Sequence, residues 1–422
     1  MDVTTIAQDA LTLLCAEAVF PADDLVRMES LIRDHVHRIG AKMLELHLAA
    51  APLGYEGSSR ACPCGANQKF VDHRPRTLTT TMGQVAYRRA YYHCGQCGCS
   101  GCPFDQAAGV GKEQTSVLLA RAAAALAVHD PFAPSADLLL EVSGRRLGQR
   151  TIHRLVRRAG ARAAEREKQL ALRMADCQSV EALVRPRRLY VAADGLIVHL
   201  DGGWHEVKCV CCYWENDRRQ RQSRRMVRLE SAEQFAAFVW SLACQCGLDH
   251  ADEVILLGDG AAWIWDHIAS VLGERTICIT DWYHVMEHVW ACGQTLFGEE
   301  SDECKAWVKK METLMWEGKS GEALSLLAKE IQPRRGAKRE AIASLQTYLT
   351  NQGTRLDYRR FREMKLDVGS GRVEAACKQA AVRMKRCGMR WSRAGAQAVL
   401  SLRSVWLNGQ WDQFWAQKPM AA

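Results

Sequence analysis

Three short apolar segments, each followed closely by an aspartate, constrain the fold of residues 187–281 more than any other feature. The segments are residues 189–193 before Asp194, residues 254–257 before Asp259, and residues 276–280 before Asp281. Continuous apolar runs of this length are typical of buried strands. Between the first two, the sequence predicts a second apolar piece of strand at residues 196–200, directly after the first, then strands at residues 207–214 and 226–229, and then an amphipathic helix at residues 232–246.

This order of elements, β-β-β-α-β-α-β, describes an RNase H-like core. The first and fourth strands of that topology are neighbours, so Asp194 and Asp259 are expected to lie together. A third carboxylate, Glu374, would be delivered by a later helix. The long interval before Glu374 contains residues 287–360, for which we predict an all-helical insertion. We therefore expect an α+β multidomain protein.

The stretch of residues 365–391 carries that third carboxylate. Ser370 is a candidate N-cap, and residues 373–384 have the composition of a helix whose only acid is Glu374. With 3.6 residues per turn, one face of this helix would carry Glu374, Lys378, Ala381 and Lys385. A carboxylate beside lysines suits a metal ion next to a phosphate backbone. The alternative is an ordinary helix whose charges are solvated.

Three such carboxylates predict a site for Mg²⁺ or Mn²⁺. Mg²⁺ prefers a few carboxylates together with water and phosphate oxygens. Two such ions, about 4 Å apart, activate an attacking oxygen and stabilise the leaving one in phosphodiester exchange. Nucleotide hydrolysis is not expected, because the sequence lacks a G-x-x-x-x-G-K-[ST] motif. The candidate catalytic and metal-binding residues are Asp194, Asp259 and Glu374.

The distribution of basic residues indicates a polyanionic partner, although 56 Lys+Arg against 48 Asp+Glu is only a modest excess. Residues 375–411 hold seven basic residues and no acid, residues 145–168 hold nine basic residues and two acids, and residues 218–228 hold six arginines and no acid. Three runs of one sign favour nucleic-acid binding over solvated surface. In the C-terminal run the candidate DNA contacts are Lys378, Lys385, Arg386 and Arg390.

Eighteen cysteines are many for a chain without an export signal, and clustered cysteines in a reducing compartment favour metal over disulfides. Two pairs flank a β-rich segment at residues 77–92: Cys62 and Cys64 before it, Cys94 and Cys97 after it. Pairs at the ends of a hairpin provide the tetrahedral thiolate site that Zn²⁺ prefers. We predict a zinc ribbon over residues 56–110, in which Cys99 or Cys102 could replace one ligand.

Residues 111–180 contain the layout of a helix-turn-helix. An apolar helix at residues 136–142 is followed by a break at Ser143-Gly144 and by an arginine-rich helix at residues 149–159. In such motifs the second helix enters the major groove, where its exposed residues meet bases and phosphates. Helix pairs also occur in bundles that bind no DNA. The candidate contacts are Arg150, His153, Arg154 and Arg157.

The remaining organisation follows from length and hydropathy. A chain of 422 residues predicts several domains. Besides those above, we expect a helical region at residues 1–55 and a catalytic domain at residues 181–286 and 361–411. The first residues lack the pattern of a signal peptide, and no apolar run reaches about 18 residues. We therefore expect a cytoplasmic protein without a membrane partner.

Short motifs from both halves of the chain match one known family. They are VAADG, LLGDGAAWIW, TDWYHVMEH, GSGRVEAACK, RMKRCGMRWSRAGAQAVLSLR and GQWDQFW, with CPCG and T-x-x-G-x-V-x-Y-R-R-x-Y-Y-x-C-x-x-C upstream. Over nearly its whole length the chain resembles bacterial insertion-sequence DDE transposases of the ISKra type. The resemblance implies an Asp-Asp-Glu triad of Asp194, Asp259 and Glu374, whose bound metal serves DNA strand cleavage and transfer.

The resemblance also implies that Asp281 and His284 form a supporting Asp-x-x-His motif. We therefore favour Asp259 over Asp281 as the second acid, because Asp259 ends the strand expected beside the first. The implied partners are double-stranded DNA, as element ends and target, and further copies of the chain, at the bacterial nucleoid. Two other functions remain open: a non-catalytic DNA-binding protein and a structure-specific nuclease on the same fold.

Overall fold

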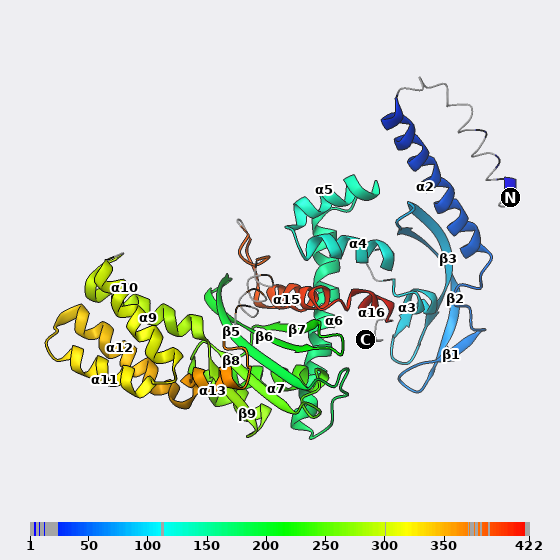
Figure 1. Cartoon of the computed structure of the whole chain (residues 1–422). Helices are drawn as coiled ribbons and strands as arrows, with labels where there is room; N and C mark the ends of the chain where they lie inside the picture. Colours follow the sequence, from blue (N-terminus) through cyan, green and yellow to red (C-terminus); the bar gives the residue numbers. More distant parts are fainter. Residues whose placement is uncertain are drawn as a thin grey trace. The chain divides into compact units, whose positions relative to one another are not determined.

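The computed structural model describes residues 24–110, 114–299, 301–369, 382–386 and 389–417, together with residues 4, 5, 8, 12, 371, 375 and 379. The chain forms two compact units, Met1–Ala159 with Gln410–Ala422, and Gly160–Gly409 (Figure 1). Each contains one sheet and several helices, so the protein is of mixed α+β class. None of the helices in the described ranges is both long and apolar enough to cross a membrane.

The first unit is built on an antiparallel sheet in the order β1-β2-β3-β4. Its strands are β1 (Ser59–Ala61), β2 (Asn67–Thr79), β3 (Gln84–His93) and β4 (Ser100–Gly101). Its helices are α2 (Leu25–Ala49), α3 (Pro103–Ala107), α4 (Val117–Ala127), α5 (Phe132–Ser143), the first part of α6 (Gln149–Ala175), and α16 (Trp411–Ala416). The alternating segment predicted at residues 77–92 is the hairpin of β2 and β3, which is longer than predicted.

Helices α5 and α6 are the predicted helix pair, but the second helix is longer than expected. Gly144 closes α5 in the left-handed conformation, with φ 63°. The prediction that α6 ends at residue 159 is wrong, because Ala163 and Ala171 continue its buried face. The C-terminal part of α6 therefore belongs to the second unit.

The second unit contains a five-stranded sheet in the order β7-β6-β5-β8-β9. Its strands are β5 (Arg188–Leu200), β6 (Gly203–Glu215), β7 (Arg221–Arg228), β8 (Glu253–Gly258) and β9 (Thr276–Thr280). Strand β5 pairs antiparallel with β6, and β6 pairs antiparallel with β7. Strand β8 pairs parallel with β5, and β9 pairs parallel with β8. The first and fourth strands of this unit are neighbours, as the sequence predicted.

Strand β5 is continuous, which corrects the prediction of two pieces separated at Asp194-Gly195. Its ladder with β6 runs without interruption through both residues. Gly195 fits this strand because the Glu206 side chain lies over it, and a Cβ at that position would overlap Oε1 of Glu206. Asp194 thus lies inside a strand, one residue beyond Ala193, the last residue paired with β8.

A core of buried residues lies between the sheet and α7 (Ala232–Gln245). Alternate residues of β5, including Leu189 and Val191, pack there with Phe235 and Val239 of α7. A π-helical turn (Ile264–Ile268) and α8 (Ala269–Leu272) close the same core between β8 and β9. Three cysteines of β6 are buried: Cys209, Cys211 and Cys212.

After β9 the chain is helical through residues 287–360 apart from short connections, as predicted. The helices are α9 (Trp282–Phe297), α10 (Asp302–Trp316), α11 (Ser320–Ile331), α12 (Gly336–Gln352) and α13 (Tyr358–Glu363). Helix α9 packs against α10 and α12, and the three lie beside the sheet at the left of Figure 1. Trp307, Met311 and Met315 of α10 are buried.

Helix α15 (Arg393–Leu407) lies along β7 and contacts α6. The contact requires glycine at position 160, because a Cβ there would overlap the carbonyl oxygen of Ala398. Gln397 joins α15 to the end of β7: its Oε1 accepts from the N–H of Leu229 at 2.8 Å, and its Nε2 donates to the carbonyl of Val227 at 3.2 Å.

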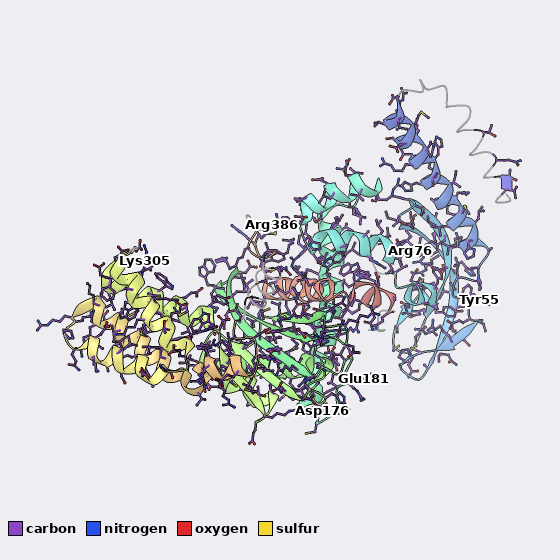
Figure 2. The ribbon with its side chains drawn as sticks, viewed as in Figure 1. Tyr55, Arg76, Asp176, Glu181, Lys305 and Arg386 are labelled. Carbon is purple, nitrogen blue, oxygen red and sulfur yellow. The ribbon has the colours of Figure 1, made fainter. Side chains whose placement is uncertain are left out.

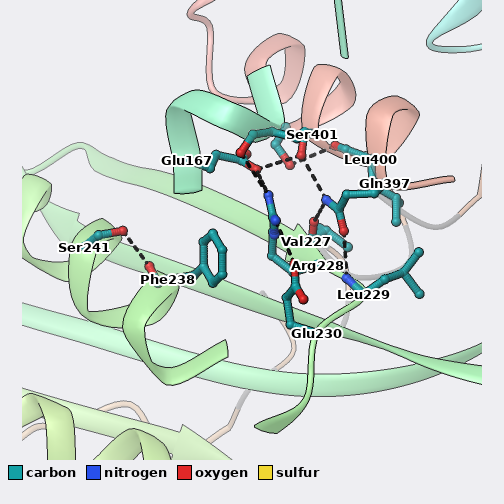
Figure 3. A network of polar contacts seen from close by, with 12 residues as sticks. Glu167, Val227, Arg228, Leu229, Glu230, Phe238, Ser241, Gln397, Leu400 and Ser401 are labelled. Atoms are coloured by element: carbon teal, nitrogen blue, oxygen red, sulfur yellow. Dashed lines mark hydrogen bonds and ion pairs between the residues drawn. The ribbon is translucent and has the colours of Figure 1, made fainter. Parts of the chain in front are cut away.

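A buried ion pair connects α6, β7 and α15 (Figure 3). The Arg228 guanidinium donates to Glu167 at 2.7 Å and to Glu230 at 2.8 Å, and its Cζ lies 4.1 Å from the centre of the Phe238 ring. The Ser401 hydroxyl donates to the same Glu167 carboxylate at 2.6 Å. Burial raises the pKa of Glu167, opposed by the charge of Arg228. Removal of either partner would leave the other as an unpaired charge, so this ion pair stabilises the packing of α6, β7 and α15.

Candidate metal centres and nucleic-acid surface

Four thiols of the first unit converge on one point. The Sγ atoms of Cys62, Cys64, Cys94 and Cys97 all lie within 4.8 Å of one another. The Cys62–Cys97 and Cys64–Cys94 separations are 3.6 Å and 3.8 Å, close to the roughly 3.8 Å between thiolates on one tetrahedral zinc. The cluster could therefore hold a metal such as zinc. Cys99 and Cys102, the alternative ligands, lie outside this group.

Two tight turns bring these cysteines together. The N–H of Gly65 donates to the carbonyl of Cys62, and the N–H of Gly98 to the carbonyl of Cys94, both at 3.0 Å. Both glycines have positive φ angles, 86° and 71°, which glycine adopts without steric cost. Backbone N–H groups, that of Cys97 above all, lower the pKa of Cys94 to about 6. Burial and the neighbouring thiols raise the pKa of Cys62 to about 12, so within this cluster Cys94 is the thiol most ready to form the thiolate, the form that binds metal.

A buried charge cluster holds α3 against the hairpin. Asp105 of α3 accepts from Arg76 at 2.6 Å, from Arg89 at 3.0 Å and from the Tyr87 hydroxyl at 3.1 Å; Arg76 is labelled in Figure 2. Burial and the charge of Asp105 raise the pKa of Tyr87 to about 12, so this hydroxyl remains a donor at neutral pH. These two arginines stabilise the fold that presents the cysteines.

Three aspartates of the second sheet, Asp194, Asp259 and Asp281, form what we call the acidic edge: β8 and β9 end directly before two of them, and the third lies beside these ends, within β5. Each directly follows one of three residues paired in register: Asp194 after Ala193, Asp259 after Gly258, and Asp281 after Thr280. Neighbouring strands are about 4.8 Å apart, so the aspartates occupy adjacent positions along the edge. Asp259 Oδ1 accepts from the N–H of Ala261 at 2.9 Å, which makes a tight turn directly after β8.

Asp281 differs from the other two because it caps α9. Its buried carboxylate accepts from the backbone N–H of His284 at 3.0 Å, and Nδ1 of His284 lies 3.4 Å from the same oxygen. The interaction with Asp281 raises the pKa of His284 to about 9. One turn further, the His288 ring lies against Tyr348, with ring centres 4.0 Å apart. Asp281 and His284 thus form a contacting pair at the start of α9, which the Asp281 cap stabilises.

Glu374 lies outside the described residues, but the chain on either side of it is anchored in the second unit. The carbonyl of Val368 accepts from the N–H of Trp282, the first residue of α9, at 2.9 Å. The carbonyl of Gln379 accepts from Nε of Arg403 in α15 at 2.8 Å. The segment that carries Glu374 therefore starts next to the aspartate that caps α9.

The donor atoms of the acidic edge fit a hard cation. Carboxylate oxygens are the ligands that Mg²⁺ and Mn²⁺ prefer, and Asp194 and Asp259 lie on neighbouring strands. The carboxylates are not gathered as closely as the thiols: within the described ranges, the cysteine cluster is the group whose ligand atoms converge within 4.8 Å. The third predicted ligand, Glu374, is not among those residues.

The α6 residues predicted to contact DNA divide into two kinds. Arg150, Arg154 and Arg157 are exposed, as phosphate contacts require. His153 is partly buried against Phe132, with ring centres 4.9 Å apart. Burial lowers the pKa of His153, so it adds no positive charge at neutral pH. The arginines are therefore the stronger candidates.

The C-terminal basic residues do not all lie on one helical face. Residues 382–386 form a turn and bend, so the predicted face of Glu374 and Lys378 does not extend to Lys385. Arg383 lies in this turn and is fully buried. Its guanidinium lies 5.1 Å from the centre of the Trp391 ring. Three predicted contacts are nevertheless exposed: Lys385, Arg386 (labelled in Figure 2) and Arg390. Ser370 and Lys378 lie outside the described residues.

Many arginines of the basic runs make contacts within the fold. This weakens the prediction of a polyanionic partner from the number of basic residues in these runs. Arg221 pairs with Glu215 at 3.2 Å, and Arg225 donates to the Gln379 side chain at 2.7 Å. Arg228, Arg383 and Arg403 are buried. Sequence runs cannot separate such arginines from those without a structural role, because several partners, such as Gln379 for Arg225 and Glu167 for Arg228, come from distant segments.

Two side chains at the acidic edge were not predicted from the sequence. The Tyr348 hydroxyl donates to the carbonyl of Asp259, and the Gln352 amide to the carbonyl of Gly260. Both belong to α12, in the helical segment. No local pattern marks them, because their function depends on a contact with a loop far away in sequence.

Comparison with known proteins identifies a family that covers most of the chain. The model of UPF0236, an uncharacterised protein family, matches residues 65–416, from directly after Cys64 to the end of α16. No curated protein matches the chain. Because the family match spans most of the sequence, including the whole second unit, this chain belongs to the UPF0236 family.

Proposed function

We propose that this protein is a DNA transposase of the ISKra type, which binds the ends of its insertion sequence and catalyses metal-dependent cleavage and transfer of DNA strands. The observation that carries the proposal is the register of β5 and β8, which gives Asp194 and Asp259 adjacent positions. The strand order β7-β6-β5-β8-β9 is the order expected of an RNase H-like core. The motifs that resemble ISKra-type transposases include both aspartates and Glu374.

In this proposal, Asp194, Asp259 and Glu374 hold Mg²⁺ or Mn²⁺. When bound, the ions would stabilise negative charge on the attacking and leaving oxygens. Water attacks phosphorus during cleavage and a DNA 3′ hydroxyl attacks it during transfer, while the bond from phosphorus to the former 3′ oxygen breaks. The exposed Lys385 and Arg386 lie on the segment after Glu374 and would hold the phosphates of the scissile strand.

The first unit would supply recognition of the element ends. The cysteine cluster, with zinc, would stabilise the β2–β3 hairpin, and α6 would present Arg150, Arg154 and Arg157 to double-stranded DNA. Action as a homo-oligomer on DNA and location at the bacterial nucleoid follow from the resemblance alone.

A supercoiled plasmid that carries the element ends tests the proposal. With Mg²⁺ or Mn²⁺, the protein should cleave at the ends or transfer strands. Asp259→Asn should abolish both reactions, whereas Asp281→Asn should retain most activity, because asparagine also caps helices well. Full activity of Asp259→Asn together with loss in Asp281→Asn would contradict the assignment of the second acid.

The same assay separates the other functions. A structure-specific nuclease would cut branched junctions regardless of terminal sequence. A non-catalytic protein would bind the ends without cutting them under any metal condition.

A further inference from the structure

We propose that Tyr348 and Gln352 of α12 are positioning residues, which fix the loop that carries Asp259 and thereby make the helical segment part of the metal site. The inference rests on the proposed function, because it assigns Asp259 as a metal ligand. Neither residue touches the reacting atoms; each would act through the main chain of the loop.

The contacts fall on the two peptide groups that immediately follow the Asp259 side chain. The Tyr348 hydroxyl donates to the carbonyl of Asp259 at 2.9 Å. Nε2 of Gln352 donates to the carbonyl of Gly260 at 3.1 Å. Within the loop, Asp259 Oδ1 accepts from the N–H of Ala261 at 2.9 Å. The direction of the carboxylate is therefore coupled to a main chain that α12 holds in two places.

The same helix end also holds the neighbouring strand. The Thr280 hydroxyl, at the end of β9, donates to Oε1 of Gln352 at 3.1 Å. Thr280 and Gln352 are buried, at 0% and 2% exposure, so water does not compete for this bond. Gln352 thus connects the loop of Asp259 to the strand that leads to Asp281.

Close approach of α12 to the loop depends on Gly260. This residue has a φ of 105°, and a Cβ there would lie 2.8 Å from Cε2 of Tyr348 and 2.9 Å from Nε2 of Gln352. The Tyr348 ring is itself held against His288.

The test measures Mn²⁺ binding to the full-length, zinc-loaded protein. Electron paramagnetic resonance detects the bound Mn²⁺. Tyr348→Phe keeps the ring and removes one donor. Tyr358→Phe is the matched control, because the Tyr358 hydroxyl donates to the carbonyl of Thr280 at 2.9 Å and does not reach the Asp259 loop. Loss of such a supporting hydrogen bond typically weakens metal binding about 10- to 100-fold.

We expect Tyr348→Phe to weaken Mn²⁺ binding at least about tenfold and Tyr358→Phe to change it less than about twofold, with similar urea midpoints for the two. Gln352→Met, which removes the side-chain bonds to Gly260, Thr280 and Arg355 at similar volume, repeats the test if Tyr348→Phe does not fold. Asp259→Asn supplies the reference for a lost ligand.

The outcomes separate the inference from the proposed function. If Asp259→Asn loses Mn²⁺ while Tyr348→Phe and Gln352→Met bind it as the wild type does, the positioning role is wrong and the metal site stands. If the wild type and Asp259→Asn bind Mn²⁺ equally, the metal site is wrong and the positioning role is wrong with it.

Discussion

The cysteine cluster and the acidic edge are both candidate metal centres, but they are assembled in opposite ways. All four thiols come from two tight turns at the ends of one hairpin, and their sulfurs lie within 4.8 Å of one another. The aspartates come from separate strands of one sheet, and they are brought side by side by strand register. Their predicted partner Glu374 belongs to a segment much later in the chain.

The difference indicates what each metal would do for the protein. The hairpin of the first unit has a small core, which includes Leu53, Leu78 and Tyr87, so a bound ion would contribute much of its folding free energy. The second unit has an extensive core around α7 and a buried ion pair. Its fold should not depend on metal, and metal there should serve chemistry alone.

The largest expected effect is the loss of a cysteine ligand. Cys94→Ser should lose bound zinc and unfold the hairpin, because no further thiol of the described residues lies in the converging group. Zinc content per chain measures the loss of metal. Limited proteolysis shows whether the hairpin has unfolded while the second unit stays folded. Asp259→Asn should leave both readouts as in the wild type.

Cys99→Ser is the matched control, since it removes an exposed thiol close to the cluster. If Cys99→Ser lost zinc while Cys94→Ser kept it, the ligand set would be wrong. If a chelator unfolded the second unit as readily as the first, the contrast between the two regions would fail.

A second prediction concerns the ion pair that holds the second unit together. Arg228→Met should leave Glu167 as an uncompensated buried charge and lower the free energy of unfolding by about 3–5 kcal/mol. Arg218→Met, in the same arginine run but exposed, should change it by less than about 0.5 kcal/mol. Urea unfolding of metal-free protein provides the measurement; equal effects of the two substitutions would contradict the structural role of Arg228.

The smallest expected effect is a pH dependence of the free energy of unfolding, which arises from the pair of Asp281 and His284. Because the pKa of His284 is raised from 6.5 to about 9, the folded state favours the protonated ring. The stability that this pair contributes should be fully present below about pH 6.5 and lost as the pH rises through about 9. Asp281→Asn should return the pKa of His284 toward 6.5 while keeping the helix cap.

An NMR titration of the histidine ring in metal-free protein measures this pKa. A value near 6.5 in the wild type would show that the His284 ring does not interact with the Asp281 carboxylate in solution, although the backbone cap by Asp281 could still form.

The sequence predicted those parts of the molecule that local pattern determines. Cysteine spacing identified the four converging thiols, and apolar runs followed by aspartate identified three adjacent edge positions. It failed where tertiary contacts decide: β5 continues through Asp194-Gly195 because β6 pairs with it throughout, and α6 extends to Ala175 because its later turns are also buried. The roles of Arg228 and Tyr348 depend on partners from distant segments, which no local pattern reveals.

The central claim is that Glu374 joins Asp194 and Asp259 around one metal. Loading the zinc-containing protein with Fe²⁺ in place of Mg²⁺, then generating hydroxyl radicals with ascorbate and peroxide, cuts the backbone close to the bound iron. We predict cuts near residues 194, 259 and 374, all lost in Asp259→Asn. Cuts near the two aspartates without one near residue 374, or a pattern unchanged by Asp259→Asn, would contradict the account.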